Sequence, residues 1–173
     1  PEDAGSRQFY GSNLPEFLKA FMAAATRDDY RLFAQCSVVE VLKSGNTTIA
    51  EFGSGGTEGL RAEEAADVCG KMGVRAYLGS PFSSGSYYTP DGKDLVWTWN
   101  EEEGFKGLEK NVDFIKKYDG AYDGRIKGMY SPGSPDGMTE GLYRKLRKTA
   151  DDVPAIINAH ACQSAHQFWQ CMR

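Results

Sequence analysis

The 173-residue chain has an ordinary globular composition, with 40% hydrophobic and 25% charged residues and a formal net charge of −4. This charge argues against a protein that binds the phosphate backbone of nucleic acids, because such a protein needs a basic face. No apolar run reaches the roughly 18 residues that a transmembrane helix requires, so we expect no membrane partner. The length allows one domain with a sizeable core.

The first half of the chain predicts helices that alternate with strands. Thr26 can cap a helix with helical spacing of its apolar residues, and Gly45 and Gly73 are typical residues for ending a helix. The strands are predicted where β-branched and apolar residues gather. The expected elements are, in order, a short helix after Asn13, a helix at 26–45, a strand at 46–52, a helix at 60–72 and a strand at 74–78.

The second half repeats this alternation after a long predicted loop, residues 79–104, which carries four aromatic residues. Residues 153–159 form a short, branched apolar run after a polar turn, so we expect a buried strand there. The expected elements after the loop are a helix at 105–118, a strand at 125–130, a helix at 138–150 capped near Thr139, the strand at 153–159 and a last helix from Ala165.

This order of elements predicts an α/β fold with a parallel sheet and helices packed outside it. Four such strands make half of a TIM (β/α)8 barrel, which needs eight strands and about 250 residues. A half-barrel would leave unpaired backbone groups at both edges of its sheet. We therefore expect residues 1–173 to be a single partial barrel domain and a fragment of a longer protein.

His160 lies where the last predicted strand meets its loop, and parallel α/β folds place their chemistry at this end of a strand. From the residues alone, a ligand-binding histidine and a core histidine bonded to a backbone carbonyl are equally supported. The long loop 79–104 follows the strand at 74–78 and is expected at the same edge. A loop of this length is usually functional.

The four cysteines are too few for a disulfide scaffold, and we expect a cytoplasmic protein. Cys36 and Cys69 lie in predicted helices and are expected to be free and buried. A structural zinc site near the C-terminus is disfavoured, because its spacing matches no common zinc motif. Its ligands would be His160, Cys162, His166 and Cys171.

Three segments resemble the amidohydrolase superfamily, in particular its cytosine-deaminase-like and chlorohydrolase-like metal-dependent hydrolases. They are Gly-Asn-Thr-Thr at 45–48, Gly-Val-Arg-Ala-Tyr-Leu at 73–78 and His-Ala-Cys-Gln-Ser at 160–164. The resemblance implies the central part of a TIM barrel, with strands two to five at 46–52, 74–78, 125–130 and 155–159. It also implies a divalent metal, zinc or iron, that activates water to hydrolyse a C–N bond, or a comparable bond, of a small cyclic substrate.

By this resemblance, His160 is the metal ligand that follows the fifth strand. Gln163 lies where deaminases of this group usually have a glutamate. An amide can orient a substrate but cannot exchange a proton. This difference disfavours simple cytosine-type deamination. No His-x-His pair occurs, and a catalytic zinc takes three or more protein ligands, so the metal site is expected to be incomplete in this chain. The aromatic residues of the long loop are expected either to stack on a flat substrate or to pack the loop down: Tyr87, Trp97 and Trp99.

Two other functions stay open at this point. One is a catalytically silent α/β fragment that serves as a folding or association module, completed by a second chain; an oligomer is compatible with the sequence. The other is a phosphate-ligand binder that uses the glycine-rich residues 53–59 before the next helix, although a tight connection is favoured there. Lys127 is expected to face solvent rather than bridge metals, and a metal-site role for Glu51 has little support.

Overall fold

The structure of the chain, a computed structural model, describes residues 24–51, 59–88, 96–161 and 172. Its sheet contains parallel strands in the spatial order β1 (Thr48–Ala50), β2 (Arg75–Leu78), β6 (Ile126–Pro132) and β7 (Ile156–Ile157). A short strand, β3 (Pro81–Phe82), follows β2 in the chain and pairs with the end of β6. The spatial order of the strands repeats their chain order, as in part of a TIM barrel.

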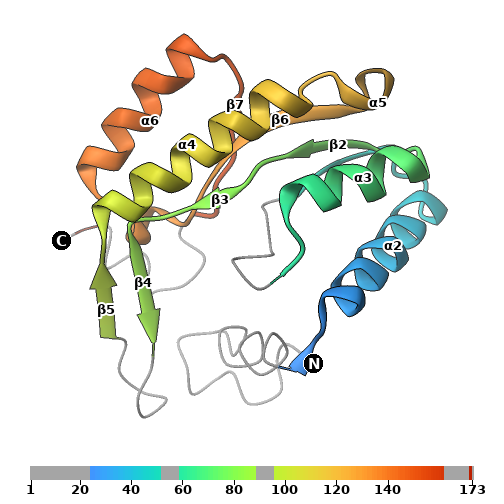
Figure 1. Cartoon of the computed structure of the whole chain (residues 1–173), viewed down its shortest axis with the longest axis horizontal. Helices are drawn as coiled ribbons and strands as arrows, with labels where there is room; N and C mark the ends of the chain where they lie inside the picture. The colour runs from blue at the N-terminus through green and yellow to red at the C-terminus, as the bar shows by residue number, and fades with distance from the viewer. Residues whose placement is uncertain (1–23, 52–58, 89–95, 162–171, 173) are drawn as a thin grey trace.

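Helices connect these strands and pack along the sheet (Figure 1). α3 lies between β1 and β2 in the chain, α4 precedes β6, and α6 joins β6 to β7, so each crossover between neighbouring strands contains a helix. The helical elements are α2 (Arg27–Lys43), α3 (Ala62–Met72), α4 (Glu101–Tyr118), the short α5 (Ala121–Gly124), the 3-10 turn η2 (Pro135–Gly137) and α6 (Glu140–Asp152).

Local sequence decides where these helices begin and end. The side chains of Thr26, Asn100 and Thr139 accept hydrogen bonds from backbone N–H groups in the first turns of α2, α4 and α6. Gly73 takes the left-handed conformation, with φ 87°, that ends α3. The predicted caps at Thr26, Thr139 and Gly73 are confirmed. α4 begins four residues before its predicted start, because Asn100 caps it and three glutamates occupy its first turn, where the helix dipole favours negative charge.

The core lies between the sheet and the helices, and α4 is its central helix. Ile126 and Tyr130 are both fully buried against α4, one in each of two apolar clusters. Gly128 lies between them, and a Cβ added there would come within 2.9 Å of the Cα of Ile115, so glycine allows α4 to approach β6 closely. Burial of each large apolar side chain here contributes about 2 kcal/mol.

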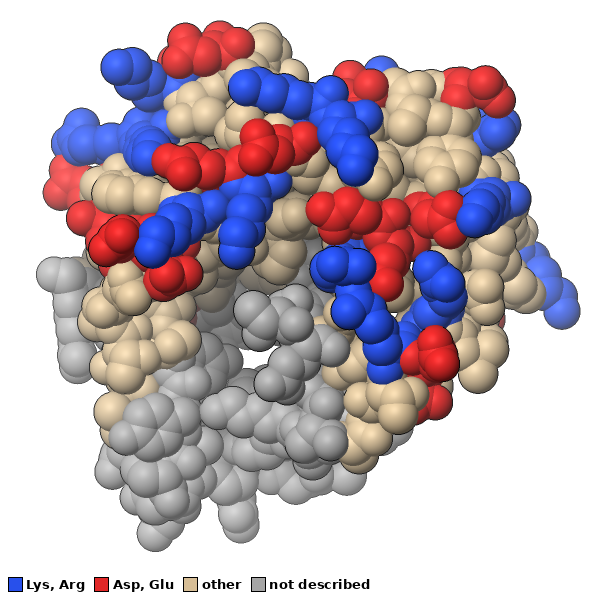
Figure 2. Space-filling view, viewed as in Figure 1, with Lys and Arg blue, Asp and Glu red and all other residues tan. Residues whose placement is uncertain are grey.

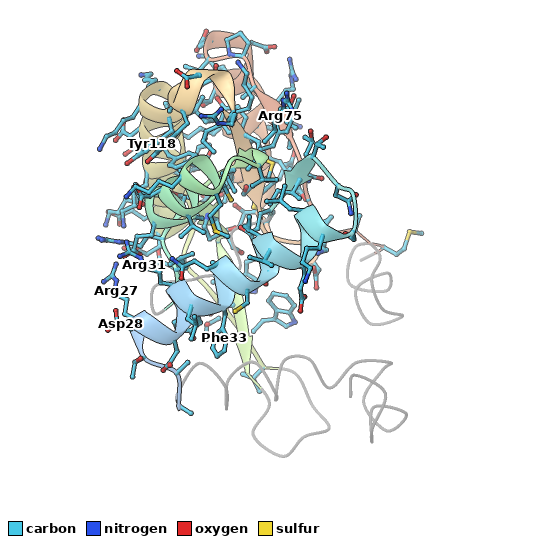
Figure 3. The ribbon with its side chains drawn as sticks, turned by 90° about the vertical axis from the view of Figure 1, so that its right-hand side faces the viewer. Arg27, Asp28, Arg31, Phe33, Arg75 and Tyr118 are labelled. Carbon is cyan, nitrogen blue, oxygen red and sulfur yellow. The ribbon has the colours of Figure 1, made fainter. Side chains whose placement is uncertain are left out.

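An ion pair between Arg27 and Glu64 links α2 to α3. Nε and Nη2 of Arg27 each donate a 3.0 Å hydrogen bond to the carboxylate of Glu64. Figure 3 shows Arg27 and Arg31 on the same side of α2, while Phe33 projects on the side away from α3. Such a bidentate guanidinium–carboxylate pair is stronger than a single surface ion pair.

Three expectations are wrong. The predicted loop 79–104 contains β3 and an antiparallel hairpin, β4 (Gly85–Tyr88) and β5 (Val96–Trp99). The strand expected to be buried near the C-terminus is short, and Ile156 and Ile157 are 49% and 42% exposed, because β7 pairs only with β6 in the described part of the chain. Cys36 is exposed on α2, since the helix buries another side; Cys69 is buried, as expected.

Charges of both signs are mixed over the face drawn in Figure 2. Charges of opposite sign also pair within the described part of the chain: Lys71 pairs with Asp67 at 2.8 Å and Lys145 pairs with Glu109 at 3.2 Å. This face therefore carries no broad field of one sign among its described residues. Of the helices that the structure describes, none has the length and apolar character needed to cross a bilayer.

Candidate functional site at the carboxyl edge of the sheet

Parallel pairing brings the carboxyl ends of the strands to one edge, where α/β proteins form their sites. The described segments at this edge are residues 79–88 and 96–100 after β2, residues 133–139 after β6 and residues 158–161 after β7. The aromatic loop 79–104 and His160 were predicted at this edge, after separate strands. The sheet places both segments there.

Hydrogen bonds fix the loop after β2 to the loop after β6. The carbonyl oxygen of Gly137 accepts from the hydroxyl of Ser83 at 2.7 Å and from the backbone N–H of Ser84 at 3.1 Å. The backbone N–H of Thr139 donates to Oγ of Ser84 at 2.7 Å. The base of the hairpin, the turn η2 and the start of α6 therefore form one connected unit.

The hairpin presents stacked aromatic rings. The rings of Trp97 and Trp99 lie 5.4 Å apart, centroid to centroid, at an interplanar angle of 17°. Successive side chains of a strand alternate in direction, so both rings lie on one face of β5. Trp99 covers Gly85 on the facing strand, where a Cβ would come within 2.8 Å of its ring. Trp99 is still 48% exposed, and such a face suits stacking on a flat ligand.

Buried polar groups without partners gather near the same edge. Asn111 donates through Nδ2 to the carbonyl oxygens of Ser80 and Met129, but no described residue contacts its Oδ1 through a hydrogen bond. The hydroxyl of Ser131 and Oδ1 of Asp136 are likewise buried and lack a hydrogen-bond partner in the described part of the chain. Buried polar atoms are nearly always paired, so this edge has the capacity to bind water or a ligand.

His160 follows β7 at its carboxyl end. The backbone N–H of Asn158 still donates to the carbonyl oxygen of Tyr130 at 3.0 Å, and His160 comes two residues later. Its side chain is exposed in the described part of the chain. Whether it binds a metal stays a prediction.

The described residues do not fit a complete metal site. Among residues 24–51, 59–88, 96–161 and 172, no group of three or more His, Cys, Asp or Glu side chains is arranged to hold a metal ion. A catalytic zinc needs at least three protein ligands, so His160 with its described neighbours is insufficient.

The structure also places Lys127 and Glu51, two residues weighed as metal-site candidates. Lys127 lies near the start of β6 and pairs with Asp119 at 3.7 Å, half exposed, in agreement with the expected solvent-directed lysine. Glu51 occupies the same face of the β1 segment as Ile49, which packs into the core cluster beneath the helices. The charge of Glu51 also contributes to raising the pKa of Cys69 on α3 to about 11, although burial of the thiol is the larger cause.

Several predicted features fall outside the described residues: Gln163, Cys162, His166, Cys171 and most of the glycine-rich segment 53–59. For Tyr87 the structure describes only the backbone, which lies opposite Trp97 in the hairpin. The sequence analysis did not single out Asp136, which lies between the predicted strand at 125–130 and the predicted helix at 138–150 and has a buried carboxyl oxygen. The available signal was a lone carboxylate in a loop that follows a parallel strand.

No protein-family model matches the chain. It is 32% identical over 126 residues to a 5'-deoxyadenosine deaminase of Methanosarcina acetivorans, a match that covers 73% of this chain and 25% of that relative. It is 31% identical over 139 residues to a 5-methylthioadenosine/S-adenosylhomocysteine deaminase of Haloarcula marismortui, covering 80% and 28%. The chain thus spans little more than a quarter of the length of these curated relatives.

A solved structure gives the same picture of the fold. A zinc-bound adenosine deaminase from Xanthomonas campestris superposes with a TM-score of 0.58 at 18% identity, over 84% of this chain and 29% of that one. The expected fold class, an α/β part of a TIM barrel with a parallel sheet, is confirmed. The homologues of this chain are deaminases of the amidohydrolase superfamily, and the chain matches a part of them, as the sequence resemblance predicted.

Proposed function

We propose that this chain is part of a metal-dependent hydrolase that cleaves a C–N bond, or a comparable bond to a leaving group, in a small cyclic substrate. The observation that carries the proposal is the position of His160 after the carboxyl end of β7, in a chain whose homologues are deaminases. Since those relatives are named for adenosine-type substrates, the substrate class we propose is a purine nucleoside.

In this proposal, His160 supplies one ligand of a divalent metal, zinc or iron, in the complete cytoplasmic protein. The described residues do not assemble a site by themselves, so the remaining ligands come from outside them. Gln163 orients the substrate through its amide, which accepts and donates hydrogen bonds without titrating. Tyr87, Trp97 and Trp99 provide ring surfaces for stacking on the purine.

Metal analysis of two proteins tests this function: the 173-residue chain and the product of the complete reading frame. The complete protein is expected to hold roughly one metal ion per active site and to release ammonia from 5'-deoxyadenosine. His160→Ala should abolish both properties, whereas His166→Ala, at the only other histidine of the sequence, should retain the metal. Metal retained by His160→Ala, or absent from the complete wild-type protein, contradicts the proposal.

The second candidate is a catalytically silent folding or association module. It is favoured by the lack of a three-ligand cluster among the described residues and by the exposed apolar edge strand β7. Such an edge offers unpaired backbone groups to another strand. Under this alternative the complete protein would hold no metal and release no ammonia, so the same experiment separates the two functions.

A further inference from the structure

Asp136 is a buried carboxyl group that the fold does not explain. The residue is only 6% exposed, and its Oδ1 has no hydrogen-bond partner among the residues that the structure describes. A buried carboxyl oxygen left unpaired destabilises a fold considerably, because it loses its hydration without replacement. Water or a bound ligand would have to satisfy it.

The backbone around Asp136 is held firmly without help from its side chain. The N–H of Gly137 donates to the carbonyl oxygen of Ser134 at 2.9 Å, and the carbonyl of Gly137 accepts from Ser83 and Ser84. None of these hydrogen bonds involves the Asp136 side chain. A buried carboxyl oxygen at the carboxyl edge that makes no hydrogen bond to a described residue suits ligand binding.

The neighbouring surface is aromatic. A Cβ placed on Gly137 would lie 3.7 Å from Cζ3 of Trp97, so the residue next to Asp136 lies close to that ring, and Trp99 stacks on Trp97. An apolar ring surface beside a hydrogen-bond acceptor matches a flat heterocycle that carries hydroxyl or amino donors. A carboxylate offers acceptors only, and it repels phosphate.

We propose that Asp136 binds the substrate by accepting a hydrogen bond from a hydroxyl or amino group of an uncharged nucleoside, next to the ring surface of Trp97, and that it selects against nucleotides. The inference rests on the proposed function, because it takes the substrate class from there. It assigns a specificity role to η2, which links the loops after β2 and β6.

Isothermal titration calorimetry of the 173-residue chain, with a chelator present, tests this role through binding alone. Adenosine should bind the wild-type chain more tightly than adenosine 5'-monophosphate, by about tenfold or more. Asp136→Asn should weaken adenosine binding about tenfold and reduce or abolish the preference over the monophosphate. The control Asp113→Asn, on the exposed side of α4, should leave both affinities unchanged.

A second variant, Trp97→Phe, guards against a general disturbance of the loop. It should weaken both ligands to a similar extent, since it trims the ring surface and leaves the carboxyl group. The proposal is overturned if Asp136→Asn keeps the wild-type preference for adenosine over adenosine 5'-monophosphate. It is also overturned if the wild-type chain binds neither ligand. In either case Asp136 pairs with an internal water only. The calorimetry measures binding and no turnover, so its result is independent of the ammonia assay. If the chain binds with the expected preference but the complete protein releases no ammonia, the proposed function is contradicted and the role of Asp136 in binding is not.

Discussion

Replacing Tyr130 by phenylalanine tests how the segment that carries His160 is held. Tyr130 is fully buried on β6, and its hydroxyl donates to the carbonyl oxygen of Val153 at 2.8 Å. Its own carbonyl accepts from Asn158 at 3.0 Å, so one residue holds both ends of the segment leading to His160. Burial of the hydroxyl, the larger cause, and the charge of Asp152 raise its pKa, as expected of a phenol away from water.

Tyr130→Phe keeps the ring and removes the hydrogen bond of the hydroxyl group, and the loss of this bond costs about 1 kcal/mol. The half-buried carbonyl group of Val153 then lacks its donor, which adds a cost of about 1 kcal/mol. We expect the free energy of unfolding in urea, followed by circular dichroism, to fall by about 2 kcal/mol, with a drop in Tm of roughly 5 °C. The control Tyr118→Phe should cost less than about 0.5 kcal/mol, because that ring keeps its stacking on Phe114. A loss below about 0.5 kcal/mol for Tyr130→Phe would show that water replaces the hydroxyl and would refute the reasoning.

Two further predictions concern α2 and α3. The hydrogen bonds from Arg27 lower the pKa of Glu64 from 4.5 to about 2, so this pair should stabilise the fold fully above pH 4.5 and lose its effect as the pH falls toward 2. Arg27→Ala should therefore lower the free energy of unfolding in urea at pH 6, and lower it progressively less as the pH falls from 4.5 to 2. An equal loss at both ends of this pH range would contradict the linkage. In the native chain, iodoacetamide should modify the exposed Cys36 well before the buried Cys69, because burial raises the pKa of the Cys69 thiol to about 11. Peptide mass spectrometry after timed quenching measures the order of modification. Modification of Cys69 first would contradict the assignment.

The elements that the sequence predicted well are those that local chemistry specifies. Thr26 caps α2 with its own hydroxyl, and Gly73 ends α3 because it takes a positive φ without strain. The alternation of helices and strands then leaves a parallel sheet as the simplest arrangement. For the same reason the position of His160 after a strand was predictable, since it follows from the chain order alone.

The failures concern properties that depend on distant residues. A strand of branched residues such as Ile156–Ile157 looks buried in sequence, but its burial requires neighbours on both sides, which no local pattern reveals. The hairpin was missed although a signal existed: Val-Trp-Thr-Trp at 96–99 alternates, and Pro-Asp-Gly at 90–92 is a turn sequence between the two strands. Asp136 attracted no notice, because its burial arises from packing between two loops.

Several hydrogen bonds between described residues hold the carboxyl edge together. Ser83 and Ser84 bind the turn η2, Asn111 on α4 donates to the carbonyl oxygens of Ser80 after β2 and Met129 within β6, and Tyr130 binds the segment before β7. A structural metal site usually folds only with its ion, whereas this edge is held by hydrogen bonds of the chain itself. A far-ultraviolet circular dichroism spectrum and a Tm of His160→Ala that match the wild type would therefore show that a loss of metal in this variant reports on the site and not on the fold.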